Sequence, residues 1–171
     1  MSPTRPRILV FTGVAGCGKT TLGRLVAGHL GRPFYEGDDF HDPVSVAKMR
    51  RGEPLDDADR LPWLRRIRDR IESSLAGETG AVFACSALKR AYREILRRPG
   101  EPILFVYLAV SPELAAKRLA SRKAHFAGPS LAQSQFAALE PPAPGEALCL
   151  EASAPPESLF RRVMERIEEE R

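Results

Sequence analysis

The chain has 171 residues, of which 43% are hydrophobic and 28% charged, as expected for one soluble globular domain large enough to bury a core. Lys and Arg outnumber Asp and Glu by 26 to 22, but the basic residues are scattered among acids. This pattern disfavours a nucleic-acid surface and leaves an anionic substrate open. No segment has the length or apolar character of a signal peptide or a membrane span. Three cysteines without metal-ligand spacing suit a reducing compartment, so we expect a cytoplasmic protein.

An apolar run at residues 8–11 opens the regular part of the chain and leads into Gly-Val-Ala-Gly-Cys-Gly-Lys-Thr at residues 13–20. This loop matches the pattern G-x-x-x-x-G-K-[ST] at every fixed position. Apolar residues at helical spacing follow it at residues 22–30. A strand, a glycine-rich loop and a helix in this order predict a phosphate-binding loop, and a chance glycine-rich turn is the alternative.

The residue types explain how such a loop holds phosphate. Its glycines allow a tight turn that points N–H groups at an anion, and the positive end of the helix dipole adds to the attraction. Lys19 can reach the β- and γ-phosphates, while the Thr20 hydroxyl can ligate magnesium. We therefore predict that the loop binds a nucleoside triphosphate. Its predicted nucleotide contacts are Gly13, Val14, Ala15, Gly16, Cys17, Gly18, Lys19, Thr20 and Thr21.

Beyond the loop, short apolar runs alternate with helical patterns. Strands are predicted at residues 33–35, 81–85, 103–110 and 147–150, and helices at residues 61–76, 88–96, 112–119 and 159–167. Polar residues fill positions 40–59, and glycine and proline make 122–144 irregular. This alternation predicts an α/β fold with a five-stranded parallel sheet covered by helices on both faces.

Ligands in such folds bind at the carboxyl ends of the strands, which places residues 13–20, Asp38 and residues 86–89 around one crevice. Asp38 follows the second strand, where its carboxylate can orient and deprotonate an attacking hydroxyl. Glu36 points the same way if the segment is still extended, and it can hold magnesium through a water. A turn or a helix cap is the alternative for Asp38 and Asp39.

Several further side chains have both a functional and a structural interpretation. Lys89 follows the third strand and is either a contact for an anionic group or a surface charge. Arg118 and Arg122 share a helix face ahead of the irregular segment. They suit the hinge side of a lid that contacts adenine and phosphates, or they form a solvated pair. The same choice between substrate contact and packing or exposure applies to His41, Trp63 and His125.

These positions belong to blocks that resemble the gluconokinase family along nearly the whole chain. The phosphate loop alone does not select a substrate. The blocks Gly-Glu-Pro-Leu-Asp-Asp and Cys-Ser-Ala-Leu-Lys, at residues 52–57 and 85–89, are much more specific. The matching blocks, in the family's order, are residues 13–20, 37–41, 48–49, 52–64, 85–93, 118–126, 134–136 and 139–142.

The resemblance implies a P-loop kinase, similar in fold to shikimate and adenylate kinases, that uses ATP and Mg²⁺ to phosphorylate the 6-hydroxyl of D-gluconate. It implies one kinase domain, commonly a homodimer, with a core at residues 7–121 and 145–171. A substrate-binding segment is expected at about 38–76 and a lid at about 122–134. The expected catalytic residues are Lys19, Asp38 and Arg122. Arg118 and Arg122 are expected to bind nucleotide, and Thr20 and Glu36 the metal. Expected substrate contacts are Asp38, His41, Arg60, Trp63, Ser86, Lys89 and His125.

The chain departs from the family pattern at Asp42, Ser45, Ala124 and the lid tip at residues 127–130, which leaves a shifted acceptor preference open. A kinase for shikimate, a nucleoside monophosphate or another sugar acid is therefore one rival interpretation. A slowly hydrolysing nucleotide switch is the other. Against the switch, the sequence contains no Asn-Lys-x-Asp guanine-reading motif, and Asp38 and the expected lid indicate a second substrate.

Overall fold

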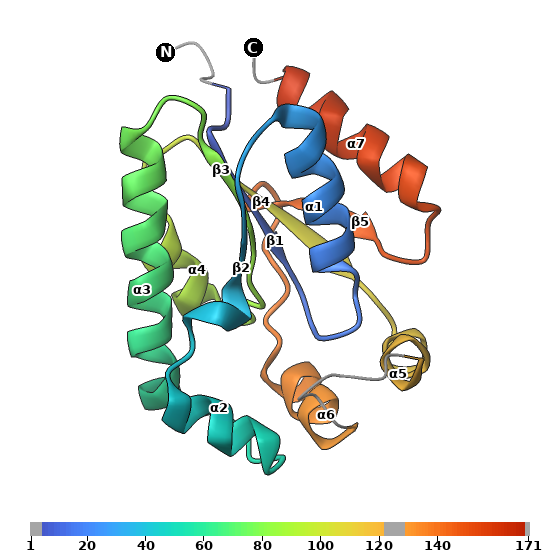
Figure 1. The fold of residues 1–171 in the computed structure, drawn as a ribbon. Helices are drawn as coiled ribbons and strands as arrows, with labels where there is room; N and C mark the ends of the chain where they lie inside the picture. Colours follow the sequence, from blue (N-terminus) through green and yellow to red (C-terminus); the bar gives the residue numbers. More distant parts are fainter. Residues whose placement is uncertain (1–4, 122–128, 170–171) are drawn as a thin grey trace.

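The computed structural model describes residues 5–121 and 129–169 and shows a sheet between two layers of helices (Figure 1). The elements in chain order are β1 (Ile8–Thr12), α1 (Lys19–Leu30), β2 (Phe34–Glu36), the 3₁₀ helix η1 (Gly37–Phe40), α2 (Pro43–Arg50), α3 (Asp57–Ala76), β3 (Ala81–Ala84), α4 (Arg90–Leu96), β4 (Ile103–Ala109), α5 (Pro112–Ala120), α6 (Pro129–Ala138), β5 (Leu148–Glu151) and α7 (Pro156–Glu169). None of the helices in these described ranges is long and apolar enough to cross a membrane.

The five strands form one parallel sheet in the order β2-β3-β1-β4-β5, which confirms the predicted fold class. The central strand is β1, whose Ile8 pairs with Ala81 of β3 and with Ile103 of β4. Residues of β1 and β3 are buried throughout, because helices cover both faces, and such strands can be apolar at every position. The strand order reverses at β1, and the crevice beyond such a reversal is where ligands bind in these folds.

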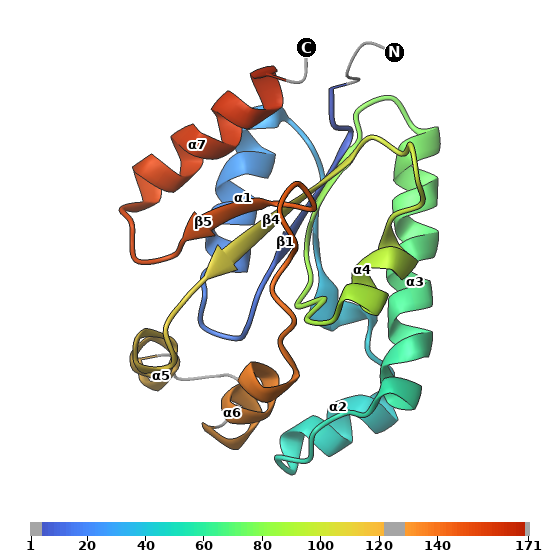
Figure 2. The ribbon, with the colours of Figure 1, turned by 180° about the vertical axis from the view of Figure 1, so that it is seen from behind.

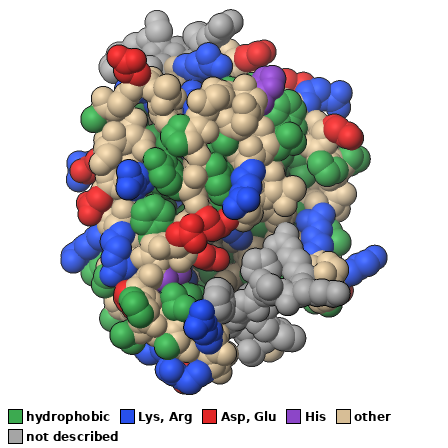
Figure 3. All heavy atoms as spheres, in the orientation of Figure 1, with side chains coloured by type: hydrophobic (Ala, Val, Ile, Leu, Met, Phe, Trp, Pro, Cys, Tyr) green, Lys and Arg blue, Asp and Glu red, His purple; other side chains and the backbone are tan. Residues whose placement is uncertain are grey.

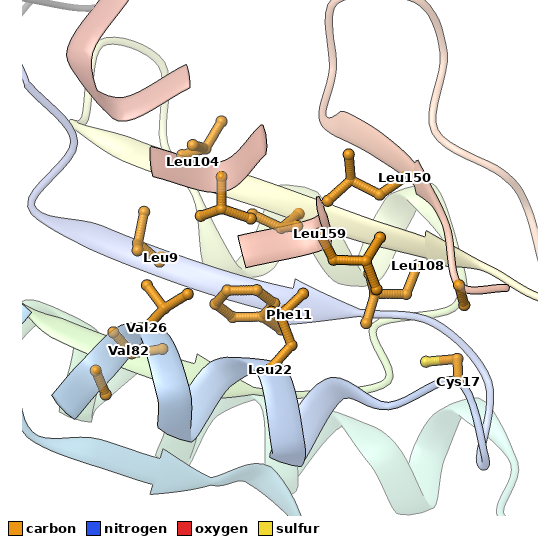
Figure 4. Packing of buried hydrophobic residues seen from close by; sticks show 14 of the residues in the cluster. Leu9, Phe11, Cys17, Leu22, Val26, Val82, Leu104, Leu108, Leu150 and Leu159 are labelled. Atoms are coloured by element: carbon orange, nitrogen blue, oxygen red, sulfur yellow. The ribbon is translucent and has the colours of Figure 1, made fainter. Parts of the chain in front are cut away.

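Each face of the sheet has its own hydrophobic core. Leu9 and Phe11 of β1 face a core that includes residues of α1 and α7, and Figure 4 shows Val26 of α1 beside them. Ile8 and Val10 belong to the other core, with residues of α3 and α4. Seen from behind in Figure 2, α3 and α4 lie on the side of the sheet opposite α1 and α7. Burying each such side chain stabilises the fold by roughly 1.5–3 kcal/mol, so the sheet is a firm base for the site.

Helix α3 begins at Asp57, earlier than the residue 61 that apolar spacing predicts. A reciprocal cap explains the early start: the N–H of Asp59 donates to Asp56 Oδ1 at 2.7 Å, and the N–H of Asp56 donates to Asp59 Oδ2 at 3.1 Å. Pro62 therefore lies inside the helix rather than in its first turn, which corrects the expectation from the sequence.

Two helices lie in segments that the sequence presents as polar or irregular. Helix α2 occupies part of residues 40–59 and begins with Asp42 as its N-cap and Pro43 in its first turn. Helix α6 occupies part of residues 122–144 and corrects the expectation that this stretch is irregular. Both helices lie beyond the carboxyl ends of the strands, at the lower end of the molecule in Figure 1. They therefore border the predicted crevice.

Candidate active site

The glycine-rich loop connects the central strand to α1, as predicted. Gly13 adopts a φ of 138°, and a Cβ there would lie 2.8 Å from the carbonyl oxygen of Leu108, so only glycine fits the first turn. The Cys17 side chain is buried in the core beneath the loop. Lys19 Nζ donates to the carbonyl oxygen of Val14 at 3.0 Å, and the N–H of Cys17 donates to the same oxygen at 3.2 Å. The lysine ammonium group is thus held over the loop, where a bound phosphate would meet it.

Thr20 and Glu36 come from neighbouring elements and meet at the edge of the loop. The Thr20 hydroxyl donates to Glu36 Oε2 at 2.7 Å, and burial raises the pKa of the Glu36 carboxyl above its usual range. Oxygen atoms of this kind are the ligands that Mg²⁺ prefers. The described residues contain no group of three or more His, Cys, Asp or Glu able to hold a metal alone. These two side chains therefore fit a magnesium ion that also needs phosphate oxygens and water.

Asp38 lies in η1, immediately after β2. The turn passes so close to β3 that a Cβ on Gly37 would lie 2.4 Å from the carbonyl oxygen of Ala84. The Asp38 side chain caps no helix of the described chain, since the N-cap of η1 is Glu36 and that of α2 is Asp42. Asp38 is exposed and lines the same pocket as the phosphate loop. Acidic side chains gather near the centre of the face in Figure 3. The geometry thus favours the functional interpretation over a capping role.

His41 and Trp63 form a stacked pair beneath this turn. Their ring centroids are 4.5 Å apart with an interplanar angle of 9°, and Trp63 Nε1 donates to the carbonyl oxygen of Gly37 at 2.7 Å. Trp63 is only 1% exposed and packs in the core. His41 lines the pocket, and Trp63 does not. Burial lowers the pKa of His41 to about 4, and its buried Nδ1 has no hydrogen-bond partner among the described residues. A neutral imidazole with an unsatisfied nitrogen therefore borders the pocket.

The two candidate cations for an acidic substrate are placed differently. Arg60 lines the pocket beside Asp38 and donates through Nε to the carbonyl oxygen of Leu55 at 3.2 Å. Lys89 is not in the lining of that pocket; it lines an adjoining one that also includes Arg60, and its Nζ pairs with Asp57 Oδ1 at 2.8 Å. This ion pair and a hydrogen bond from the Tyr92 hydroxyl hold the pKa of Asp57 below its usual range. Arg60 is thus the better placed of the two predicted cations.

One pocket brings together most of the predicted site residues. It is lined by Ala15, Gly16, Gly18, Lys19, Thr20, Glu36, Asp38, Asp39, His41, Val46, Met49, Leu55, Arg60, Ala84, Ser86, Leu119, Ser134 and Gln135. Sequence reasoning about single residues missed the lining residues of α2 and α6. Met49, Ser134 and Gln135 have one sequence signal, membership in the blocks at residues 48–49 and 134–136 that resemble gluconokinases, and Val46 has none.

Arg118 is not among the residues that line this pocket. Its guanidinium donates to the carbonyl oxygen of Cys17 at 3.3 Å and to that of Ala152 at 2.6 Å. The structure therefore places it where the loop meets the segment after β5, rather than as a solvated residue. Arg122 and His125 lie outside the described residues, as do Ala124 and most of the predicted lid.

The departures from the family pattern near His41 have a local structural explanation. Asp42 Oδ1 accepts a hydrogen bond from the N–H of Ser45 at 2.7 Å, and this bond holds the pKa of Asp42 below its usual range. Ser45 itself is buried. The unusual residues thus cap α2 and do not line the pocket.

Comparisons with known proteins agree with this geometry. A family model described as shikimate kinase matches residues 15–143. The gluconokinase of Gluconobacter oxydans (strain 621H) is 48% identical over 142 residues, which cover 83% of this chain and 80% of that protein. An unliganded sugar kinase structure from Janibacter sp. HTCC2649 is 40% identical, with a TM-score of 0.88 and coverage of 97% of this chain and 95% of that one. A gluconokinase structure from Sinorhizobium meliloti 1021 is 37% identical, with a TM-score of 0.84 and coverage of 97% and 94%. The phosphate loop and Asp38 line one pocket, and the relatives at 37–48% identity match most of both chains. The chain therefore belongs to the gluconokinase family of P-loop kinases.

Proposed function

We propose that this protein transfers the γ-phosphoryl group of ATP to the 6-hydroxyl of D-gluconate, giving 6-phosphogluconate and ADP. The observation that carries the proposal is the shared pocket, in which the phosphate loop, the exposed Asp38 carboxylate and the Arg60 guanidinium face one space. A nucleotide-binding switch needs only the first of these three features. A kinase for a small acid needs all of them.

On the donor side, the loop amides and Lys19 bind the β- and γ-phosphates. Lys19 exchanges its hydrogen bond to the Val14 carbonyl for phosphate oxygens, so little reorganisation of the loop is needed. Thr20 and Glu36 would hold Mg²⁺, directly and through water. When bound, the ion neutralises charge on the β- and γ-phosphate oxygens. Arg118 sits on the adenine side of the loop in this scheme, and Arg122 is proposed to approach the phosphates from the lid.

On the acceptor side, Asp38 accepts the proton of the attacking hydroxyl. The hydroxyl oxygen forms a bond to the γ-phosphorus while the bond to the bridging oxygen of ADP breaks, and ADP leaves with that electron pair. Asp38 lines the same pocket as Lys19, and in this proposal it orients the hydroxyl in line with the leaving oxygen.

Recognition of the sugar acid is assigned to side chains that line the pocket. We propose that Arg60 pairs with the gluconate carboxylate, since Lys89 is already paired with Asp57. The neutral His41 ring forms part of the pocket wall against the sugar chain, and Ser86 offers a hydroxyl group. Several features are proposed from the family resemblance alone. They are a substrate contact by His125, a lid at about 122–134, a core at 7–121 and 145–171, and a substrate-binding segment at about 38–76. The cytoplasmic location and the homodimer are proposed on the same ground.

The test is ADP release measured with a panel of gluconate, shikimate, AMP and no acceptor, in the presence of Mg²⁺. Gluconate should raise the rate far above the rate without acceptor. Shikimate is the necessary comparison, because the matching family model is described as shikimate kinase. A rate that ignores gluconate but responds to another acceptor would move the protein to a related kinase. A slow rate that ignores every acceptor would favour the nucleotide switch.

A further inference from the structure

The residues just beyond the C-terminal end of helix α6 are hydrogen-bonded to the segment that follows β3. The N–H of Glu140 donates to the carbonyl oxygen of Leu88 at 2.9 Å, and the N–H of Arg90 donates to Glu140 Oε2 at 2.8 Å. Arg93, which is 2% exposed, donates through Nη1 to the carbonyl oxygen of Glu140 at 3.0 Å. Phe136 and Leu139 also pack against the core beneath the phosphate loop. Core packing of Phe136 and the bonds of Glu140 therefore anchor the C-terminal end of α6 at the site.

Gln135 projects from this end of α6 onto the phosphate loop. The N–H of Ala15 donates to Gln135 Oε1 at 2.7 Å, although the two residues are far apart in the sequence. Because a backbone N–H can only donate, the atom that contacts it must be the amide oxygen, which fixes the orientation of the carboxamide. The Nε2 group then faces away from Ala15 and keeps two donors. Within residues 5–121 and 129–169, Ala15 supplies the only hydrogen bond of this side chain.

The surroundings show what those two donors can reach. Gln135 lines the same pocket as Lys19 and Asp38, and its contact with Ala15 places it against the phosphate loop. Oxygen atoms of a transferring phosphoryl group would pass through this space during in-line transfer. A neutral amide suits them, since it donates hydrogen bonds without adding a charge that would hold the product.

We propose that Gln135 is a further catalytic residue, which holds the transferring phosphoryl group with Nε2 while Oε1 is fixed by the Ala15 amide. The inference rests on the proposed kinase activity. It makes a specific claim about nucleotides: Gln135 recognises the γ-phosphoryl group and not the ADP portion. A residue that only braces the loop would affect ATP and ADP alike.

The experiment compares Gln135→Ala and Gln135→Glu with matched controls at Gln133, an exposed glutamine on the same helix. Gln135→Glu keeps an oxygen for the Ala15 N–H but replaces the donors with a negative charge. Gln133→Ala and Gln133→Glu make the same chemical changes away from the pocket. Calorimetry with Mg²⁺ measures the Kd of ADP and of a non-hydrolysable ATP analogue for each variant. The kcat with gluconate is measured in parallel, and an ¹⁵N spectrum reports the Ala15 amide.

Both Gln135 variants should bind the ATP analogue about tenfold or more weakly, the loss expected for a hydrogen bond to a charged group, while the Kd of ADP stays within about twofold. Gln135→Glu should be the weaker binder, and kcat should fall in both. The Gln133 variants should match the wild type. Equal weakening of ADP and the analogue, or wild-type behaviour of Gln135→Glu, would overturn the proposal. Because these binding measurements need no acceptor, they remain decisive even if gluconate proves not to be the substrate.

Discussion

The stacked His41 ring makes the stability of the protein depend on pH in a way that can be calculated. Burial lowers its pKa from the ordinary value of 6.5 to about 4 in the folded state. Below pH 6.5 the His41 imidazole is therefore protonated in the unfolded chain, whereas in the folded protein it stays neutral until the pH falls to about 4. The free energy of unfolding should fall across this window and change little above it on account of His41. The shift corresponds to about 2 kcal/mol between ~pH 7 and ~pH 5, with a limit of roughly 3 kcal/mol at lower pH.

The assay is urea unfolding at a series of pH values for the wild type, His41→Phe and His41→Gln. Neither replacement titrates, and Phe also keeps a ring that can stack on Trp63. Acidic groups contribute to acid unfolding in all three proteins, so the difference between wild type and variant isolates His41. Relative to the wild type, each variant should gain about 2 kcal/mol in its free energy of unfolding as the pH falls from ~7 to ~5. Parallel stability curves, or an NMR titration of His41 near 6.5, would refute the reasoning.

Three further substitutions test the site. Asp38→Asn should lower kcat at least about 100-fold, the usual loss for a missing general base, with little change in the Kd of an ATP analogue; near-normal turnover would remove Asp38 from its role. Arg60→Met should raise the KM for gluconate roughly 30-fold, whereas Lys89→Met should change it by less than about threefold, and the reverse order would exchange their assignments. Gly37→Ala places a Cβ 2.4 Å from the carbonyl oxygen of Ala84 and should cost about 1–3 kcal/mol on thermal unfolding, so an unchanged Tm would contradict the close packing.

The sheet and the phosphate loop were predictable because their signals are local. A buried parallel strand such as β1 is a continuous apolar run, and residues 13–20 carry a spacing that few other structures require. The position of Asp38 followed from topology, since parallel strands end at the same edge. These inferences needed neither side-chain contacts nor knowledge of the acceptor.

The rest depended on contacts between segments far apart in the sequence. Helices α2 and α6 carry no strong apolar stripe, so the spacing of their apolar residues does not predict a helix. Lys89 looked as available as Arg60 until the structure paired it with Asp57. Arg93 reads as an ordinary helix charge, yet it is buried and contacts Glu140 and Glu146. Such pairings depend on tertiary packing between distant segments, and a short stretch of sequence does not show which segments meet.

The sheet itself makes no use of the chain between Gly37 and Asp56. This stretch contains η1 and α2 but no strand, so it pairs with no neighbour and fixes no register. It supplies His41, Met49 and Leu55 to the pocket. Substitutions of the pocket-lining residues Met49 and Leu55 would therefore change the acceptor side while the strand pairing stays as it is. The acceptor side of the pocket is thus built largely on a connection between strands, whereas the donor side is built on the central strand and the loop that follows it.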